Sequence, residues 1–286
     1  MQATNAPTDK LDVQAQSFYG EVLDALLGAG IPFLVGGGYA FAVHTSIHRQ
    51  TKDLDIFIRP RDKERTLQAA VKAGYRTEIT FEHWLAKIFS GADFIDVIFS
   101  SGNGLAEVND IWFAHALDAD VLGRLVRLCA PEEMIWSKAF IMERERYDGA
   151  DIAHLLRRRG AALDWVRLLQ HFGEHWPVLL SHLILYSYVY PGEPSPMPDE
   201  VMTHLLQKWD KQRRIIPPGI RICRGPLLSR AQYLVDIEDW GYEDVRLAPS
   251  GAMSAEEICR WTQAIPAELR HEANHERREK HEKEQV

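Results

Sequence analysis

The sequence predicts an α+β protein in which a strand-containing N-terminal domain precedes a mostly helical domain. Two observations lead to this fold class. Short apolar runs with strand-like spacing recur as far as Cys129, separated by turns rich in glycine and polar residues. After Pro131 the spacing of apolar residues becomes helical and stays so to about Trp209. The expected domains are therefore residues 1–130, 131–265 and a charged, exposed tail over 266–286.

Apolar spacing and turn residues predict the helices and strands of the N-terminal domain. Phe18, Val22 and Leu26 recur at helical spacing, and Gly28 ends that helix. Apolar residues alternate with Asp53 and Asp55, which is typical of a strand. A helix is expected over 62–73, and further strands are expected at 32–35, 84–89, 94–99, 111–116 and 125–129.

Composition narrows the class of protein. The three cysteines are far apart without CxxC spacing, so neither a disulfide framework nor a thiolate zinc site is indicated. The first ten residues are polar and do not resemble a signal peptide. The longest apolar stretch, 176–190, contains Ser181, His182 and Ser187, and a bilayer span needs about 20 mostly apolar residues. We therefore expect a buried helix there, no membrane association and a cytoplasmic protein.

Charge is unevenly distributed. The formal net charge is −8, which disfavours a protein that grips nucleic acid over a whole face. The segment 208–230 is the exception, with seven cations against Asp210. It is either a solvated face or a local anion-binding patch, on which Trp209 could stack an RNA base.

Two carboxylates, Asp53 and Asp55, are separated by one residue of a predicted strand, so they project from the same face. Such acids repel each other, and a hard divalent cation with oxygen ligands relieves the repulsion. A strand edge with two solvated acids is the alternative. Asp96 is a third acid, central in the apolar strand 94–99, where an unpaired charge is costly; a solvent-facing edge position is its alternative.

The run Gly36, Gly37 and Gly38 joins a predicted strand to a helix. Backbone N–H groups at such a turn can face a phosphate, and glycine lets the backbone approach closely. A tight strand–helix turn explains the same glycines without a ligand.

Together the glycine run and the three acids resemble the signature of polymerase-β-like nucleotidyltransferases, and most closely the minimal and toxin–antitoxin-associated (AbiEii-type) bacterial branches. The resemblance covers about residues 15–160. It implies a polymerase-β-type mixed sheet, with metal ligands and catalytic acids at Asp53, Asp55 and Asp96. It also implies nucleotide contacts from the residues of the glycine run and its surroundings: Gly36, Gly37, Gly38, Arg49 and Thr51.

A second match lies downstream. The segment from Pro131 to Lys138, followed by Arg144, Asp148 and Asp151, is similar to a helical motif of the toxin-type branch. The resemblance implies that Lys138 approaches the nucleotide phosphates, whereas a surface lysine is the alternative. For Asp148 we expect a helix-capping role. Some family members have serine at the position of Gly38, so one hydroxyl contact to phosphate is missing here.

The resemblance implies a reaction. An acceptor hydroxyl attacks the α-phosphate of an NTP and releases pyrophosphate, with two Mg²⁺ or Mn²⁺ ions about 4 Å apart at the reacting oxygens. Asp96 completes the nucleophile-side metal and accepts the hydroxyl proton. The acceptor is open among RNA, a protein and a small alcohol, and a cognate antitoxin is a further expected partner. The alternative function is a catalytically inactive relative that binds nucleotide or a protein.

Two histidine patterns are weaker. His271, Glu272 and His275 match HExxH, but their tail lacks the apolar residues that build a zinc protease cleft. His171 and His175 share i, i+4 spacing, yet Phe172 and Trp176 beside them indicate a packed helix.

Overall fold

The computed structural model describes residues 13–49, 51, 53–215, 219 and 221–264. Its centre is a seven-stranded sheet in the order β3-β4-β5-β2-β1-β7-β6. The β2–β5 and β1–β7 pairs are parallel and the other pairs are antiparallel. The sheet is therefore mixed, and the predicted α+β class is confirmed. Its strands are β1 (Leu34–Val35), β2 (Leu54–Phe57), β3 (Arg76–Phe81), β4 (Leu85–Ser90), β5 (Asp93–Ile98), β6 (Leu117–Val121) and β7 (Arg124–Leu128).

Helices connect and cover these strands. The apolar face expected from Phe18, Val22 and Leu26 is buried in the core, and the chain leaves the helix through Gly30, which has φ +61°. The helix after the glycine run is also present and carries Tyr39, Ala40 and Phe41 into the core. These N-terminal helices are α1 (Val13–Gly28), α2 (Gly37–Thr45), η1 (Pro60–Asp62), α3 (Lys63–Lys72) and α4 (Asp110–Ala114).

One predicted strand is wrong. Residues 111–116, expected to be extended, lie mostly in helix α4. The Asn109 side chain caps this helix by accepting a hydrogen bond from the Ile111 N–H, and Trp112 and Phe113 are buried behind it. Local capping and tertiary burial thus override the β-propensity of an aromatic run. Strands β3 and β6 were not predicted from the sequence, because most of their residues are polar or only partly buried.

The helical part begins at Pro131, as its proline and first-turn acids predict. Its elements are α5 (Pro131–Lys138), α6 (Gly149–Arg159), η2 (Gly160–Ala162), α7 (Trp165–Phe172), η3 (Gly173–His175), α8 (Trp176–Val189) and α9 (Asp199–Gln212). The expectation of a buried helix at 176–190 is only half right. Leu179 and Leu183 of α8 are fully buried, but Ile184 and Tyr188 are exposed. Within the described residues, no helix is long and apolar enough to cross a bilayer.

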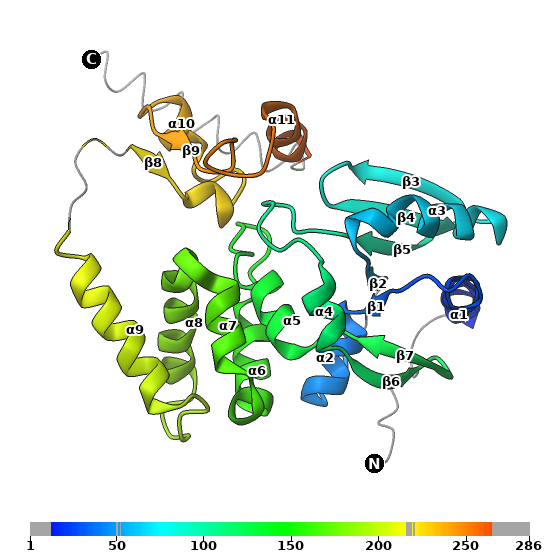
Figure 1. The fold of residues 1–286 in the computed structure, drawn as a ribbon, viewed down its shortest axis with the longest axis horizontal. Helices are drawn as coiled ribbons and strands as arrows, with labels where there is room; N and C mark the ends of the chain where they lie inside the picture. The colour runs from blue at the N-terminus through cyan, green and yellow to red at the C-terminus, as the bar shows by residue number, and fades with distance from the viewer. Residues whose placement is uncertain (1–12, 50, 52, 216–218, 220, 265–286) are drawn as a thin grey trace.

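The last described elements return toward the sheet. They are β8 (Ile222–Cys223), η4 (Gly225–Leu227), α10 (Leu234–Glu238), β9 (Glu243–Asp244) and α11 (Ala255–Gln263), and β8 pairs with β9. The Trp261 ring of α11 packs against Phe81 and Trp84, with centroids 5.0 and 5.1 Å apart. Figure 1 shows α11 beside β3, and α6–α9 on the opposite side of the molecule from the β3–β5 strands. The chain after α9 is thus not purely helical.

Candidate active site

The glycine turn packs directly against the second predicted acid. Gly36 precedes α2, and its N–H donates to the Asp55 carbonyl at 3.0 Å. Gly37 has φ +50°, and a Cβ built there would lie 1.6 Å from Asp55 Oδ2. Only glycine fits this position, because a side chain would collide with the carboxylate and strain the backbone. The turn that can face an anion and the strand that carries the acids therefore form one site.

Strand register aligns the charged side chains. Asp55 of β2 is the direct neighbour of Asp96 on β5, and Asp96 is in turn opposite Lys87 of β4. Neighbouring residues in such pairs share a face of the sheet. Lys87 Nζ lies 2.6 Å from Asp96 Oδ1. A row of lysine and two carboxylates thus crosses three strands on one face.

Asp53 lies at the entrance of β2 and is held by Thr51. The Thr51 hydroxyl is 3.0 Å from Asp53 Oδ1 and 2.9 Å from the Asp53 carbonyl. The same threonine packs against the glycine turn, because a Cβ at Gly38 would lie 3.1 Å from Thr51 Cβ. Thr51 therefore contacts both predicted parts of the site.

The negative charges of Asp55 and Asp96 on the sheet are only partly balanced by nearby cations. Burial, and then the charges of Asp53 and Asp96, raise the pKa of Asp55 to about 7, against a smaller opposing effect of Lys138 and Arg146. Burial also raises the pKa of Asp96, although its hydrogen bond to Lys87 acts in the opposite direction. A carboxylate in this position resists ionisation unless a cation approaches.

The donor set fits a hard divalent cation. All three side chains offer oxygen ligands, and the pKa of Asp55 is raised by burial first and then by the neighbouring charges of Asp53 and Asp96. Among the described residues, no group of three or more His, Cys, Asp or Glu side chains is arranged to hold a metal ion. Mg²⁺ does not require such a cage, since it usually uses one or two carboxylates together with water and substrate phosphates.

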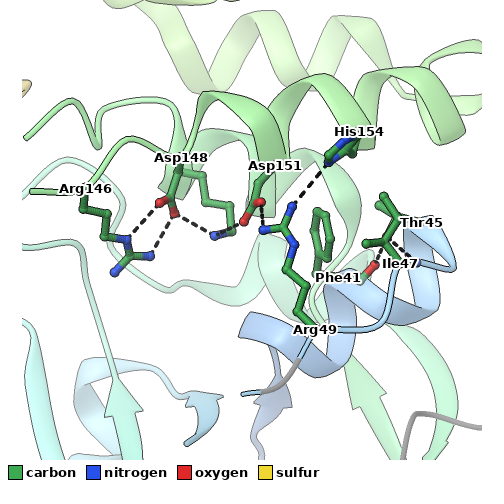
Figure 2. Close-up of polar contacts among 9 residues, drawn as sticks. Phe41, Thr45, Ile47, Arg49, Arg146, Asp148, Asp151 and His154 are labelled. Atoms are coloured by element: carbon green, nitrogen blue, oxygen red, sulfur yellow. Dashed lines mark hydrogen bonds and ion pairs between the residues drawn. The ribbon is translucent and has the colours of Figure 1, made fainter. Parts of the chain in front are cut away.

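A chain of ion pairs lies across the first turn of α6 (Figure 2). Lys138 Nζ is 2.7 Å from Asp148 Oδ2 and 2.8 Å from Asp151 Oδ2. Arg146 also pairs with Asp148, at 2.8 Å, and Arg49 pairs with Asp151. These contacts tie α5, α6 and the segment after α2 together, and Lys138 and Arg146 lie close enough to influence Asp55.

The expected capping role of Asp148 is wrong. Asp148 occupies the N-cap position of α6, but its side chain makes no capping hydrogen bond. Its carboxylate instead accepts hydrogen bonds from Lys138 and Arg146. Burial alone would raise the pKa of Asp148, but these two cations lower it. Two positive partners are electrostatically stronger than one backbone N–H.

Arg49 is directed toward α6. Besides Asp151, its guanidinium lies 3.4 Å from His154 Nδ1 and 4.6 Å from the centroid of the Phe41 ring. Sequence reasoning missed Lys87 and Arg146 as partners of the acids. Lys87 carried a signal, since it interrupts the apolar run 85–89, whereas nothing in the sequence marked Arg146 over Arg144.

The other predicted features contribute no catalytic geometry. His171 Nε2 donates to Glu133 Oε1 at 3.1 Å, and the imidazole stacks on the Trp136 ring, as expected for a packed helix. The HExxH match lies outside the described residues. In the basic segment, Arg213 and Arg214 pair with Asp210, Arg224 pairs with Glu174, and Arg230 pairs with Glu143 and Glu145.

Comparison with known proteins points to the same part of the chain. Residues 20–97 match the family model described as aminoglycoside-2''-adenylyltransferase. This segment runs from α1 to β5 and contains the glycine turn and all three acids. The match agrees with the nucleotidyltransferase class predicted from those residues. No curated protein matches the chain.

Several solved structures are similar at low identity. The antibiotic-resistance factor ANT(2'')-Ia is 18% identical, with 60% of this chain and 98% of that chain covered and a TM-score of 0.42. The lincomycin-bound lincosamide antibiotic adenylyltransferase LnuA is 15% identical, with 51% and 98% covered and a TM-score of 0.36. JHP933 from Helicobacter pylori is 14% identical, with 72% and 97% covered and a TM-score of 0.35.

Proposed function

We propose that this chain is a metal-dependent nucleotidyltransferase that moves a nucleoside monophosphate from an NTP to an acceptor hydroxyl. The observation that carries the proposal is the contact between the glycine turn and Asp55, within a row of acids whose charge is poorly compensated. A phosphate-binding turn and a cation-binding carboxylate set on one site match what an NTP–metal complex requires. The family match over residues 20–97 supports the same class.

In this proposal Asp53, Asp55 and Asp96 hold Mg²⁺ or Mn²⁺. When bound, the metal stabilises negative charge on the phosphate oxygens and on the attacking and leaving oxygens. Thr51 fixes one oxygen of Asp53, and Lys87 fixes one oxygen of Asp96. Pre-orienting the ligands in this way lowers the reorganisation needed when the substrate arrives.

The nucleotide lies between the glycine turn and α6. Gly36, Gly37 and Gly38 let the backbone approach the phosphates, while Lys138 and Arg146 supply positive charge. Both cations already act on Asp55 electrostatically, which supports their placement near the triphosphate. Arg49 contributes by holding Asp151 beside Lys138, so its proposed contact with nucleotide is indirect.

The chemical step is a substitution at phosphorus. The acceptor oxygen forms a bond to the α-phosphorus, and the bond from that phosphorus to the oxygen bridging to the β-phosphate breaks. The bridging oxygen keeps the electron pair and leaves as pyrophosphate. The acceptor proton passes to Asp96 and then to solvent.

We favour a small, cationic alcohol as the acceptor. The family matched by residues 20–97 is described by an aminoglycoside-modifying activity, and a net charge of −8 attracts cations over long distances and repels polyanions. RNA is less well supported, because Arg213, Arg214, Arg224 and Arg230 are ion-paired with acids.

One experiment tests the function and the acceptor class together. The purified protein is incubated with each α-³²P-labelled NTP, Mg²⁺ and, separately, an aminoglycoside mixture, total RNA or cell protein. Label on a small molecule supports the proposal, whereas label on RNA or protein changes the acceptor. The RNA outcome should also weaken steeply between about 50 and 200 mM salt. If no acceptor is labelled while nucleotide still binds, the chain is the inactive relative.

A toxin role rests on the α5–α6 motif with Lys138 and Asp148. It predicts growth arrest on expression, relief by a neighbouring gene product, and loss of arrest in Asp53→Asn/Asp55→Asn. Growth that is equal for wild type and variant excludes this role without affecting the enzymatic proposal.

A further inference from the structure

One buried polar group beside the acids has no partner. Tyr39 is the third residue of α2 and is 1% exposed. Its hydroxyl is buried and, among the described residues, has no hydrogen-bond partner. An unpaired buried hydroxyl costs free energy, so phenylalanine would be the more stable choice for the fold alone. A group of this kind calls for an explanation in function.

The location of Tyr39 connects it with Asp53. Tyr39 directly follows Gly38, which packs on Thr51, and the Thr51 hydroxyl donates to Asp53 Oδ1. The first turn of α2 therefore lies against the segment that carries the first acid. The electrostatics agree, since burial and then the charges of Tyr19 and Asp53 raise the pKa of Tyr39. The hydroxyl thus keeps its proton and can act only as a donor toward an acid.

We propose that the Tyr39 hydroxyl is a positioning donor for Asp53, held without a partner in the metal-free protein and used when a divalent cation fixes the carboxylate. Thr51 already holds Oδ1 of Asp53, and a second donor would set the orientation of the whole carboxylate. Partners that orient metal ligands typically contribute 10–100-fold to metal affinity. This inference rests on the proposed metal site.

Tyr39→Phe removes the hydroxyl and keeps the ring in the core, so it separates a positioning role from a structural one. We expect the metal-free variant to be as resistant to urea as the wild type or more so, because an unpaired donor is removed. Its Mn²⁺ affinity, measured by paramagnetic resonance titration, should fall by about 10–100-fold. A purely structural tyrosine would not give this opposite pair of effects.

Tyr75→Phe is the matched control. The Tyr75 hydroxyl donates to Glu21 at 2.6 Å, so its loss should lower the urea midpoint and leave Mn²⁺ affinity unchanged. Unchanged Mn²⁺ affinity in Tyr39→Phe overturns the inference, as does a loss of affinity that only accompanies unfolding. If the wild type binds no Mn²⁺ even with a non-hydrolysable NTP analogue present, the proposed metal site fails and this inference with it. If the wild type binds Mn²⁺ and Tyr39→Phe binds it equally well, only this inference fails and the proposed function is unaffected.

Discussion

The acids on the sheet and the acids at the start of α6 lie near the same two cations, Lys138 and Arg146, yet the two groups differ in how their negative charge is balanced. Among the described residues, Lys87 is the cation ion-paired with the Asp53, Asp55 and Asp96 set, whereas Asp148 and Asp151 are ion-paired with Lys138, Arg146 and Arg49. The pKa of Asp55 is raised to about 7, and that of Asp148 is lowered. Among the described residues, one cation is thus ion-paired with the three acids on the sheet, whereas three cations are ion-paired with the two acids of α6.

This difference indicates that the acids on the sheet are suited to binding a cation, whereas those of α6 hold the helix in place. The ion-pair chain fixes the position of α6, and its cations would act on a nearby phosphate by their charge. An under-compensated carboxylate set destabilises the metal-free protein but gains strongly when a cation binds. Removing acids from the sheet should therefore stabilise the metal-free protein, whereas breaking the ion pairs of α6 should destabilise it.

The largest effect is expected for Asp53→Asn/Asp55→Asn. Loss of these proposed metal ligands should reduce nucleotidyl transfer by about a thousandfold or more, measured with labelled NTP. Asp118→Asn, which changes an exposed acid on the far strand β6, is the control and should keep full activity. Transfer that survives in the double variant would remove the acids from the catalytic site.

The same substitution should stabilise the metal-free protein at pH 8. The folded-state pKa of Asp55 is raised above its unfolded value, so ionisation disfavours the folded state increasingly as pH rises from about 4 to 7. Asparagine cannot ionise, and the gain in the urea midpoint should disappear near pH 4. A destabilised variant at pH 8 would mean that the acids are already compensated.

In the ion-pair chain at α6, Lys138→Met should lower the free energy of unfolding. We expect about 2 kcal/mol, below the 3–5 kcal/mol typical of a broken buried pair, because Arg146 and Arg49 remain on the two acids. Adding Asp151→Asn should recover part of this stability in urea titrations. If Lys138 also binds phosphate, NTP affinity in calorimetry stays weak in the double variant; recovery of both would make the lysine purely structural.

Gly37→Ala tests the junction of the glycine turn with the sheet acids. The added Cβ must displace the Asp55 carboxylate and strain the backbone, so transfer should fall by at least tenfold. Gly74→Ala is the control, because Gly74 has φ +95° but open space around its Cβ position. It should lose about 1 kcal/mol of stability with normal transfer. Equal effects of the two variants on transfer would reduce Gly37 to a conformational role.

His44 shows a third way to bury a titratable group, which is to keep it neutral. Burial lowers its pKa to about 4, although its hydrogen bond to the Cys129 carbonyl acts in the opposite direction. The unfolded state binds the proton more readily, so stability should be complete above pH 6.5 and decrease as pH falls toward 4. The slope reaches at most about 1.4 kcal/mol per pH unit. Urea titrations of His44→Gln should show a flatter profile; an unchanged profile would assign the pH dependence to other groups.

The smallest effect is expected at the end of α9. Arg213 and Arg214 form exposed pairs with Asp210, and exposed pairs contribute roughly 0–1 kcal/mol. With a small-molecule acceptor, Arg213→Glu/Arg214→Glu should change transfer by less than about twofold at any salt concentration. A large, salt-dependent loss would instead restore RNA as the acceptor.

Much of the fold followed from local sequence. The buried faces of α1 and α2, the start of α5 and the strands around Asp55 and Asp96 were predictable, because periodic burial and terminal residues act over a few positions. Residues 111–116 were not, since Asn109 capping and the burial of Trp112 decided between strand and helix. Strand β3 was also not predictable, because an edge strand with half-exposed residues lacks a clear apolar alternation.

Local sequence marks the residues that we propose to carry the chemistry: three glycines after a strand, two acids on the next strand and a third acid on a later one. Their partners follow from the packing of sheet and helices. Strand register placed Asp55 beside Asp96 and Asp96 beside Lys87, and helix packing placed Lys138 between Asp148 and Asp151. Which charges are left uncompensated depends on contacts between residues distant in sequence, and these arise only when the sheet and helices come together.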